Sequence, residues 1–421
     1  MSEFKTYTLE QLCIVGSSKR VHLSDYVQHG VPFYRSKEVI EISSGKNISE
    51  QLFISLEKYS EIKSKFPVPQ ENDVLITAVG TIGEILVVKD PNFYFKDGNL
   101  IWLRNINFDI IDVDYLYYFF KSDLFQKTIK YNNIGAVQKA LTIDFLKTVK
   151  ITLPSLDNQR KLISVLKSID KKLKINTQIN KELEAMAKTL YDYWFVQFDF
   201  PDQNGKPYKT SGGKMVYNPE LKREIPEGWG VEALKDFESK IITGKTPSRA
   251  NSDNFGGEIP FITIGDIRGN TFIYSTSETL TDLGASVQQN KYLPQGSLCV
   301  SCIATVGEIG FTTEPSHTNQ QINSIVFEDE TNRYYLYFAL KNYFENANAS
   351  AKTGNTFANM NKEDFSGIKI IFPNKEIKNK FHKITEPYFS QIKCLQGQNQ
   401  ELTQLRDWIL PMLMNGQVKV E

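Results

Sequence analysis

Apolar residues recur in alternating steps of four and three along two stretches, one after Pro154 and one after Pro373. This spacing places side chains on one narrow face of a helix, which is the coiled-coil pattern. In the first stretch the seam positions are Leu162, Leu166, Ile169, Leu173, Asn176, Asn180, Leu183, Ala187, Leu190 and Trp194. In the second they are Ile377, Phe381, Ile384, Tyr388, Gln391, Leu395, Gln398, Leu402, Leu405, Ile409 and Met412. We therefore predict two long helices.

Amides interrupt both seams near the middle, at Asn176 and Asn180 in the first and at Gln391 and Gln398 in the second. Buried amides lower the stability of a helix pair but restrict its register and its partner. The matched polar segments suggest that the two helices pack on each other. The alternative is that each helix only caps its own domain. Pro387 should kink the second helix.

The rest of the chain mixes shorter patterns. Runs rich in β-branched and aromatic residues predict strands, namely DVLITAV (73–79), EILVV (84–88), LIWL (100–103), EIPFITI (258–264) and NSIVF (323–327). Apolar residues at helical spacing predict amphipathic helices at 113–131 and 332–347. No glycine-rich turn opens a βαβ unit, so the pattern indicates an α+β fold.

The two halves of the chain repeat one another. TAVGTIGEI (77–85) matches SCIATVGEI (301–309), and GAVQKALTIDFLKTVKITLP (135–154) matches GNTFANMNKEDFSGIKIIFP (354–373). The order of matching segments is preserved, as in a duplicated domain with loop insertions. The shorter phrase is typical of a strand, a turn and a strand, with Gly83 and Gly307 permitting the bend. We expect its apolar residues to be buried, namely Val79, Ile82, Ile303 and Val306.

These patterns predict two duplicated globular domains separated by two long antiparallel coiled-coil helices. The connector between the first helix and the second domain is rich in Gly, Pro, Asn and Lys, so we expect irregular turns rather than a packed element. The predicted segments are a first domain at 1–154, a central spacer helix at 155–198, the connector at 199–225, a second domain at 226–373 and a C-terminal spacer helix at 374–421.

Composition limits the class of protein. Lys plus Arg and Asp plus Glu number 49 each, so no overall basic field holds the chain on nucleic acid, although local basic faces remain possible. The start, MSEFKTYTLE, lacks a secretion signal, and no apolar run approaches the roughly 18 residues of a membrane span. Four scattered cysteines do not form a disulfide framework. We expect a soluble, cytoplasmic protein.

Motifs that could carry chemistry are weak. SKIITGKT (239–246) lacks the first glycine of a phosphate-binding loop, and Pro247 follows where a helix should continue. Cys299 and Cys302 have metal-ligand spacing, but the first copy has no cysteine there, which favours packing within a strand. The histidines are dispersed, and no methyltransferase, nuclease or helicase motif set is complete. We predict a non-catalytic chain without a metal site.

Two similar domains with different loops on a rigid spacer suit recognition of two objects at a fixed separation. Duplex DNA presents base edges at regular intervals, and paired readers recognise paired half-sites. We predict one half-site per domain and hence an asymmetric, split DNA target. From Leu156 to Trp194 the first helix would span roughly 58 Å at about 1.5 Å per residue. The alternative is a coiled-coil adaptor whose end domains bind proteins.

Three stretches carry a resemblance to a known family: GAVQKALTIDFLKTVKITLPSLDNQRKLISVLKSIDKKL (135–173), FDFPDQNGKPYKTSGGKMVYNPELKREIPEGW (198–229) and GKTPSRANSDNFGGEIPFITIGDI (244–267). The sequence resembles the specificity subunit of type I restriction–modification systems over essentially its whole length. The residues that match the family's domain-to-helix signature are Gly135, Gln138, Leu141, Leu153, Pro154 and Gln159. The second copy departs from this signature, since Phe357 replaces the glutamine and FPNKEIKNK replaces the phrase that contains Gln159.

The resemblance implies two target recognition domains and a helix pair that acts as a ruler. It also implies a complex with two modification subunits, which bind adenosylmethionine and methylate adenine, and with restriction subunits, which use ATP to translocate and cut double-stranded DNA. Adenosylmethionine, ATP and Mg²⁺ are therefore expected on the partner subunits, and no cofactor is expected on this chain.

Candidate DNA contacts are polar and basic residues on loops of each domain. Arg or Lys suits guanine, and Gln or Asn suits adenine, in the major groove. The alternative for each residue is an ordinary solvated side chain or a phosphate contact. The candidates are Ser18, Lys19, Arg20, Arg35, Lys37, Gln138 and Lys139 in the first domain, and Lys245, Thr246, Ser248, Arg249, Arg268, Asn319, Gln320 and Gln321 in the second.

Overall fold

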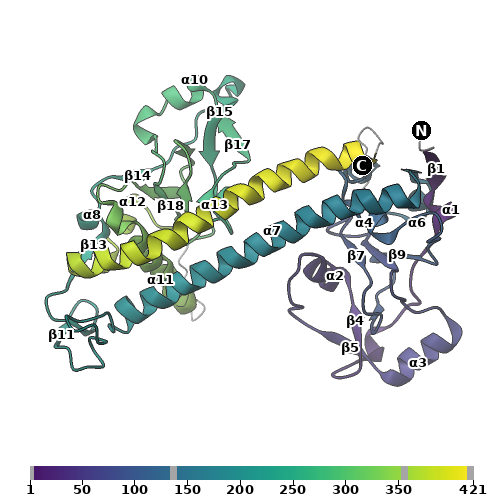
Figure 1. The fold of residues 1–421 in the computed structure, drawn as a ribbon, viewed down its shortest axis with the longest axis horizontal. Coiled ribbons are helices and arrows are strands. Elements are labelled where there is room, and N and C mark those ends of the chain that lie inside the picture. Colours follow the sequence, from purple (N-terminus) through teal and green to yellow (C-terminus); the bar gives the residue numbers. More distant parts are fainter. Residues whose placement is uncertain (1–3, 133–139, 352–358, 415–421) are drawn as a thin grey trace. The chain divides into compact units, whose positions relative to one another are not determined.

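A computed structural model of the chain describes residues 4–132, 140–351 and 359–414 (Figure 1). The chain divides into two compact units. Unit 1 comprises Met1–Lys172 with Leu402–Glu421, and unit 2 comprises Leu173–Glu401. Two long helices, α7 (Leu156–Tyr191) and α13 (Lys375–Met414), each contribute residues to both units.

The described residues of unit 1 form two four-stranded sheets and one strand pair. The sheets have the orders β2-β9-β6-β7 and β3-β5-β4-β8, and β1 pairs antiparallel with β10. The strands are β1 (Lys5–Thr8), β2 (Ile14–Gly16), β3 (Tyr26–Val27), β4 (Val31–Tyr34), β5 (Leu52–Ile54), β6 (Val74–Thr77), β7 (Ile85–Val87), β8 (Tyr94–Phe95), β9 (Leu100–Arg104) and β10 (Lys150–Leu153). Its shorter helices are α1 (Leu9–Leu12), α2 (Ser36–Ser43), α3 (Leu56–Lys65), α4 (Val113–Lys121), α5 (Asp123–Asn132) and α6 (Ile143–Thr148), with a 3₁₀ turn at Leu23–Asp25.

The main core of unit 1 lies between the β2-β9-β6-β7 sheet and the helices. Alternate residues of β6, Val74 and Ile76, share this core with Tyr115 and Leu116 from the apolar face of α4. Leu166 of α7 is fully buried in the same core. The start of α7 is therefore part of the globular body of unit 1, because its apolar face completes the core.

Unit 2 is built in the same order with additions. Its main sheet is β14-β21-β18-β19-β16, its second sheet is β17-β15-β20, and β13 pairs antiparallel with β22 as β1 pairs with β10. The strands are β11 (Met215–Asn218), β12 (Arg223–Pro226), β13 (Gly230–Ala233), β14 (Ile241–Thr243), β15 (Phe255–Ile262), β16 (Phe272–Ile273), β17 (Glu278–Leu280), β18 (Leu298–Ser301), β19 (Ile309–Thr312), β20 (His317–Thr318), β21 (Ile322–Ile325) and β22 (Lys369–Phe372). Its shorter helices are α8 (Leu234–Phe237), α9 (Ile264–Ile267), α10 (Asp282–Ser286), α11 (Arg333–Ala351) and α12 (Lys362–Ser366), with 3₁₀ turns at Ser252–Asn254, Gln289–Lys291 and Glu330–Asn332.

The duplication and the strand–helix pattern expected from the sequence are confirmed. All five expected strands form, as β6, β7, β9, β15 and β21. The segment 332–347 is helical within α11, whereas 113–131 forms two helices, α4 and α5, on either side of Ser122. Matching elements carry matching roles, since α4 and α11 each supply the aromatic helix that packs against the main sheet of their own unit.

The seam of α7 is confirmed, but that of α13 is partly wrong. Every seam position expected in α7 is buried or half-buried, and Leu166 and Ala187 are fully enclosed. In α13, however, Ile384, Gln391, Gln398 and Leu405 are exposed. The buried line of α13 contains Phe381, Thr385, Phe389, Ile392 and Leu395, one position away from the expected seam over its middle part. The helix is continuous through Pro387, whose ring lies on the solvent face.

The polar segment of the helix pair lies in unit 2. The Nδ2 of Asn176 donates hydrogen bonds to Asn399 Oδ1 at 3.0 Å and to Gln398 Oε1 at 3.4 Å. Further along the same pair, the ring of Tyr191 meets that of Phe381, which gives the two helices opposite directions. In unit 1, Arg406 of α13 likewise contacts Asp170 of α7 at 3.3 Å. The helices therefore pack antiparallel, as expected, and Asn176 bonds to Gln398 and Asn399.

The connector is packed, which corrects the expectation of an irregular segment. Phe198 and Phe200 are buried in the core of unit 2, and Phe200 stacks on Trp229 with ring centroids 4.8 Å apart. A short π-helix (Asp192–Val196) follows α7, and β11 and β12 form a hairpin. The glycines and prolines supply the turns, but the aromatic residues between them bury enough apolar surface to hold the segment in place.

Each long helix joins its domain through a buried side chain at the same position of the repeat. In unit 1 it is Gln159, and in unit 2 it is Lys378. The ammonium of Lys378 donates to the Oδ1 of Asn332 and lies 3.1 Å from Asp329. Asn332 in turn donates to the buried Glu238 at 2.7 Å. The second copy thus departs from the family signature but keeps the joint, with an ionic network in place of an amide.

We expect Lys378→Met to destabilise unit 2 by about 2 kcal/mol, because it removes a buried, charge-assisted hydrogen bond to Asn332. Lys380→Met on the same helix is the matched control, since the Lys380–Glu376 pair is solvent-exposed and should be worth less than about 1 kcal/mol. Chemical denaturation of both variants measures the difference. Equal small losses would contradict a structural role for Lys378.

Within the described residues no helix is both long and apolar enough to cross a membrane.

Candidate nucleic-acid interface

The phrase repeated in the sequence forms the same turn in both units. In unit 1, the hydroxyl of Thr77 donates to the carbonyl of Thr81 at 2.6 Å and accepts from the amide of Glu84 at 2.9 Å. In unit 2, Ser301 makes the same two bonds to Thr305 and Glu308, at 2.5 and 2.9 Å. We call these segments, 77–84 and 301–308, the repeated turns.

The tips of the repeated turns are exposed, which corrects part of the sequence interpretation. The side chain of Val79 is 42% exposed, and Ile82, Ile303 and Val306 are only half-buried. Gly83 has a φ of +87°, so its expected role in the bend is confirmed. The strands on either side are buried as expected, but the apolar residues at the tip are not.

In unit 1 three loops meet at one short turn, residues 96–99, between β8 and β9. The hydroxyl of Ser17 donates to Leu100 and that of Ser36 donates to Asn99. The amide of Ala78, in the repeated turn, also donates to Asn99, at 2.9 Å. These bonds gather the loop 17–20, the start of α2 and the repeated turn around residues 96–99, which we call the central turn of unit 1.

Unit 2 has the equivalent arrangement. Its central turn, residues 319–321, lies between β20 and β21. The amides of Gly244 and Lys245 donate to Ile322 and Thr318, and that of Cys302, in the repeated turn, donates to Gln321 at 2.8 Å. Asn319 donates to Ile262 at the end of β15. The loop 244–249, the end of β15 and the repeated turn therefore surround the central turn, as in unit 1.

The structure brings most candidate DNA contacts of unit 1 to this place. Arg20 pairs with Asp97 of the central turn at 2.8 Å, and its side chain is 69% exposed. The backbone amide of Lys19 donates to Tyr94, and its ammonium lies 5.1 Å above the ring of Phe66. The hydroxyl of Ser18 donates to the carbonyl of Phe95 and so holds the loop 17–20 against β8. Lys19 and Arg20 are both exposed, so both charges of this group are accessible.

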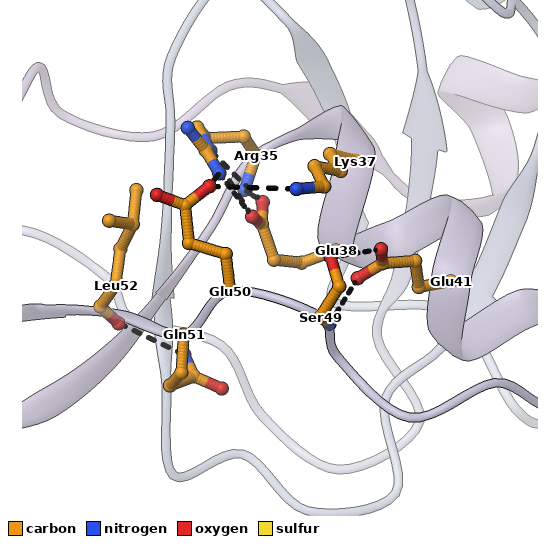
Figure 2. A network of polar contacts seen from close by, with 8 residues as sticks. All are labelled: Arg35, Lys37, Glu38, Glu41, Ser49, Glu50, Gln51 and Leu52. Atoms are coloured by element: carbon orange, nitrogen blue, oxygen red, sulfur yellow. Dashed lines mark hydrogen bonds and ion pairs between the residues drawn. The ribbon is translucent and has the colours of Figure 1, made fainter. Parts of the chain in front are cut away.

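Arg35 and Lys37 belong to a network at the start of α2 (Figure 2). The carboxylate of Glu38 is fully buried and accepts three kinds of N–H from Arg35, namely the backbone amide at 2.6 Å, Nη2 at 2.6 Å and Nε at 3.2 Å. Glu50 lies 3.4 Å from Arg35 and 3.5 Å from Lys37. The hydrogen bond with Glu38 raises the pKa of Arg35. Figure 2 shows Arg35 turned toward the two carboxylates. The main role of this arginine is therefore to neutralise the buried charge of Glu38.

In unit 2 the basic candidates are also paired with acids. Arg249 makes two hydrogen bonds to Glu278, at 3.0 and 2.9 Å, and lies above the ring of Phe255. The hydrogen bond from Arg249 lowers the pKa of Glu278. Arg268 reaches Glu308 and Thr305 of the repeated turn at 3.3 Å each. Both guanidinium groups remain largely exposed beyond these pairs.

The amide candidates form the central turn of unit 2 itself. Asn319 and Gln321 bond to each other, through Nδ2 to Oε1 at 3.1 Å and through the Gln321 amide to Asn319 Oδ1 at 3.0 Å. Gln320 is exposed and accepts a hydrogen bond from the hydroxyl of Thr246 at 2.6 Å. Lys245 and Ser248 lie on the same loop as Thr246. All eight candidates of unit 2 are thus within this unit's loop cluster or on the helix end beside it.

Two candidates, Gln138 and Lys139, lie outside the described residues. The residues that follow them are described: Ala140 forms a bridge with Val79, and Leu141 donates to Ala78 at 2.9 Å. In unit 2 Asn359 and Met360 make the same contacts with Ile303 and Cys302. The matching segments therefore contact the repeated turn at equivalent places, 140–141 in unit 1 and 359–360 in unit 2.

The acids that pair with the candidates were missed by the sequence analysis. Asp97, Glu278 and Glu308 lie far along the chain from Arg20, Arg249 and Arg268, and no spacing rule connects them. The one local signal was Glu38, three residues after Arg35, at the position of a helix-capping carboxylate.

Cys299 and Cys302 are core residues of β18 and the repeated turn that follows it. Both are buried, and burial raises the pKa of Cys299 to about 12 and that of Cys302 to about 11. The thiols are therefore protonated at neutral pH, whereas metal ligation and redox exchange need the thiolate. Within the described ranges no three His, Cys, Asp or Glu side chains gather in a way that could hold a metal ion.

The fold and the loop clusters define a class: a duplicated α+β protein with two equivalent polar sites of different composition. The family model described as "Type I restriction modification DNA specificity domain" matches residues 1–185 and 226–404. The chain therefore belongs to the specificity-subunit family of type I restriction–modification systems.

Curated relatives and a solved structure agree with this family. The chain is 34% identical over 331 residues to the type I restriction enzyme HindI specificity subunit of Haemophilus influenzae, covering 66% of this chain and 71% of that protein. It is 27% identical over 418 residues to the MjaIX specificity subunit of Methanocaldococcus jannaschii, covering 96% and 91%. The crystal structure of a type I restriction–modification S subunit from M. genitalium has a TM-score of 0.55 at 14% identity, covering 98% of this chain and 96% of that one, and shows a shared fold.

Proposed function

We propose that this chain reads an asymmetric, two-part DNA sequence, one half with the loop cluster of each unit. The observation that carries the proposal is the equivalence of the two clusters. In both clusters an amide of the repeated turn donates to the central turn, from Ala78 to Asn99 and from Cys302 to Gln321, but the polar side chains differ, with Arg20 and Asp97 in unit 1 and Thr246 and Gln320 in unit 2. Equivalent frames with different chemistry suit two different half-sites.

The helix pair α7–α13 is proposed to set the gap between the half-sites. Support comes from its antiparallel packing in each unit and from the burial of its ends in the cores of the two units. The chain itself carries out no chemistry in this proposal. Two modification subunits would bind adenosylmethionine and methylate adenine, and restriction subunits would cut DNA with ATP and Mg²⁺, as expected for the family.

Methylation sequencing tests the proposal. DNA from cells that carry the complete system is expected to be methylated at a split sequence with two unlike halves. Arg20→Ala should change or relax the half read by unit 1 and leave the other half unchanged. A change in both halves, or methylation of an unsplit sequence, would contradict one half-site per unit. Unchanged methylation after replacement of each unit in turn would instead indicate a coiled-coil adaptor.

A further inference from the structure

We propose that Gln320 reads an adenine in the half-site of unit 2 and that Thr246 positions its amide. The proposal rests on the function proposed above and names a reading residue, its positioning partner and the base. It follows from four features of the central turn of unit 2, which concern the neighbouring amides, the hydroxyl of Thr246, the loop backbone and the comparison with unit 1.

The first feature is that the neighbouring amides, those of Asn319 and Gln321, bond to each other. Asn319 and Gln321 are half-buried and use their side chains on each other, with Asn319 Oδ1 also held by the backbone amide of Gln321. These bonds stabilise the turn. Gln320 lies between them at the tip and is exposed. It is the one amide of these three whose side chain is exposed.

Thr246 fixes the orientation of this amide. Its hydroxyl donates to Gln320 Oε1 at 2.6 Å. A carbonyl oxygen has two lone pairs, so one remains after this bond, beside the two N–H groups of Nε2. Among the described residues Nε2 has no hydrogen-bond partner. Gln320 therefore presents one acceptor and one donor side by side.

This pair of groups complements adenine in the major groove. Adenine offers the N6 amino group as a donor and N7 as an acceptor, and a glutamine amide bonds to both at once. Guanine offers two acceptors, O6 and N7, and these would repel the Oε1 of Gln320. A glutamine that rotates freely can exchange its two ends, so the bond from Thr246 contributes discrimination as well as order.

The position of Thr246 is itself fixed by the backbone. The amides of Gly244 and Lys245 donate to Ile322 and Thr318 on either side of the central turn. A Cβ on Gly244 would lie 2.2 Å from the carbonyl oxygen of Asn319 and 2.4 Å from that of Thr318. Only glycine permits this approach, which brings the loop against the turn and Thr246 against Gln320.

Unit 1 holds a different pair at the equivalent place. There the loop residue Arg20 pairs with Asp97 of the central turn. In the major groove a guanidinium suits guanine and a carboxylate suits cytosine, whereas an amide suits adenine, so the groups at the equivalent places favour different bases. Arg20→Ala is therefore the matched control for variants at Thr246 and Gln320.

The test uses the complete complex and four variants. Thr246→Val keeps the shape of the side chain but removes its hydroxyl, Thr246→Ser keeps the hydroxyl, and Gln320→Glu keeps the acceptor but removes the donor to N7. We expect Thr246→Val to relax one adenine position of one half-site and Thr246→Ser to retain it. Gln320→Glu should change the preference at that same position from adenine toward cytosine, whose amino group a carboxylate accepts. Arg20→Ala should affect only the other half-site.

A base analogue provides a second measurement. Duplexes that carry the mapped sequence with 7-deazaadenine at the affected position lack the N7 acceptor. The wild-type complex should methylate them about tenfold more slowly, whereas Gln320→Glu should not distinguish them from adenine. Unaltered sequence preference in both Thr246→Val and Gln320→Glu, with an intact split target, would overturn this inference and leave the proposed function standing. A wild-type target without two halves would overturn the proposed function itself.

Discussion

Replacing Arg35 by alanine is expected to lower the free energy of unfolding of unit 1 by about 3 kcal/mol, because it leaves the carboxylate of Glu38 buried without its cation. Glu38 has no exposed surface, and Arg35 supplies the side-chain cation that it contacts at 2.6 Å. Removing both charges in Arg35→Ala with Glu38→Ala should restore part of the loss. Chemical denaturation, with hydrogen exchange of β4 and α2 to locate the effect, measures it.

Arg20→Ala is the control for this experiment. Its pair with Asp97 is also close, at 2.8 Å, but the arginine side chain is 69% exposed, so the loss should stay below about 1 kcal/mol. Similar losses in both variants would refute the structural role of Arg35. The comparison also distinguishes a loss of folding from a loss of sequence recognition. A loss of methylation in Arg35→Ala reports on sequence recognition only where unit 1 remains folded.

Replacing Gln159 by leucine should cost unit 1 a similar amount, about 3 kcal/mol, because three backbone groups in one buried and two part-buried hydrogen bonds lose their partner. The side chain of Gln159 accepts from the amide of Asp112 and donates to the carbonyls of Ile110 and Pro154, all at 2.9 to 3.0 Å. These bonds join the start of α7 to the segment before α4. Hydrogen exchange should therefore increase at Asp112 and in the first turns of α7.

Gln178→Leu on the same helix is the matched control. Gln178 is exposed and bonds only to Glu182 of its own helix among the described residues, so the replacement should change stability by less than about 0.5 kcal/mol. A small effect of Gln159→Leu, equal to that of the control, would contradict its role as the joint between domain and helix.

The fold was predictable where the sequence pattern is local. The seam of α7 and the strands β6 and β9 follow from hydrophobic periodicity. The buried face of α13 differs from the predicted seam because apolar residues occupy adjacent faces of this helix. Contacts with the rest of unit 2 determine which of these faces is buried. For example, Tyr274 donates its hydroxyl to the carbonyl of Lys393 at 2.6 Å, which no periodicity reveals. The prediction of an irregular connector was wrong for a similar reason, since the turn-rich composition of this segment concealed the aromatic cluster around Phe200.

The candidate site was predictable as a set of residues but not as an arrangement. Loop position and side-chain chemistry selected Arg20, Thr246 and Gln320, because the repeat separates framework from variable loops. Their partners could not be assigned, since the Arg20–Asp97 and Thr246–Gln320 contacts span long stretches of sequence. Burial of Glu38 was also hidden, because an acid three residues after a loop arginine is usually solvated at a helix start. Tertiary burial, not sequence pattern, gives Arg35 its structural role.

The helix pair as a ruler is the central claim, and a paired insertion tests it most directly. One heptad inserted after Lys172 in α7 and one after Glu401 in α13 leaves the residues of each unit intact and adds about 10 Å to the pair. Methylation sequencing of cells with this variant should show both half-sites unchanged and the gap between them longer by about 3 base pairs, at about 3.4 Å each. An active variant that keeps the original gap would contradict the account.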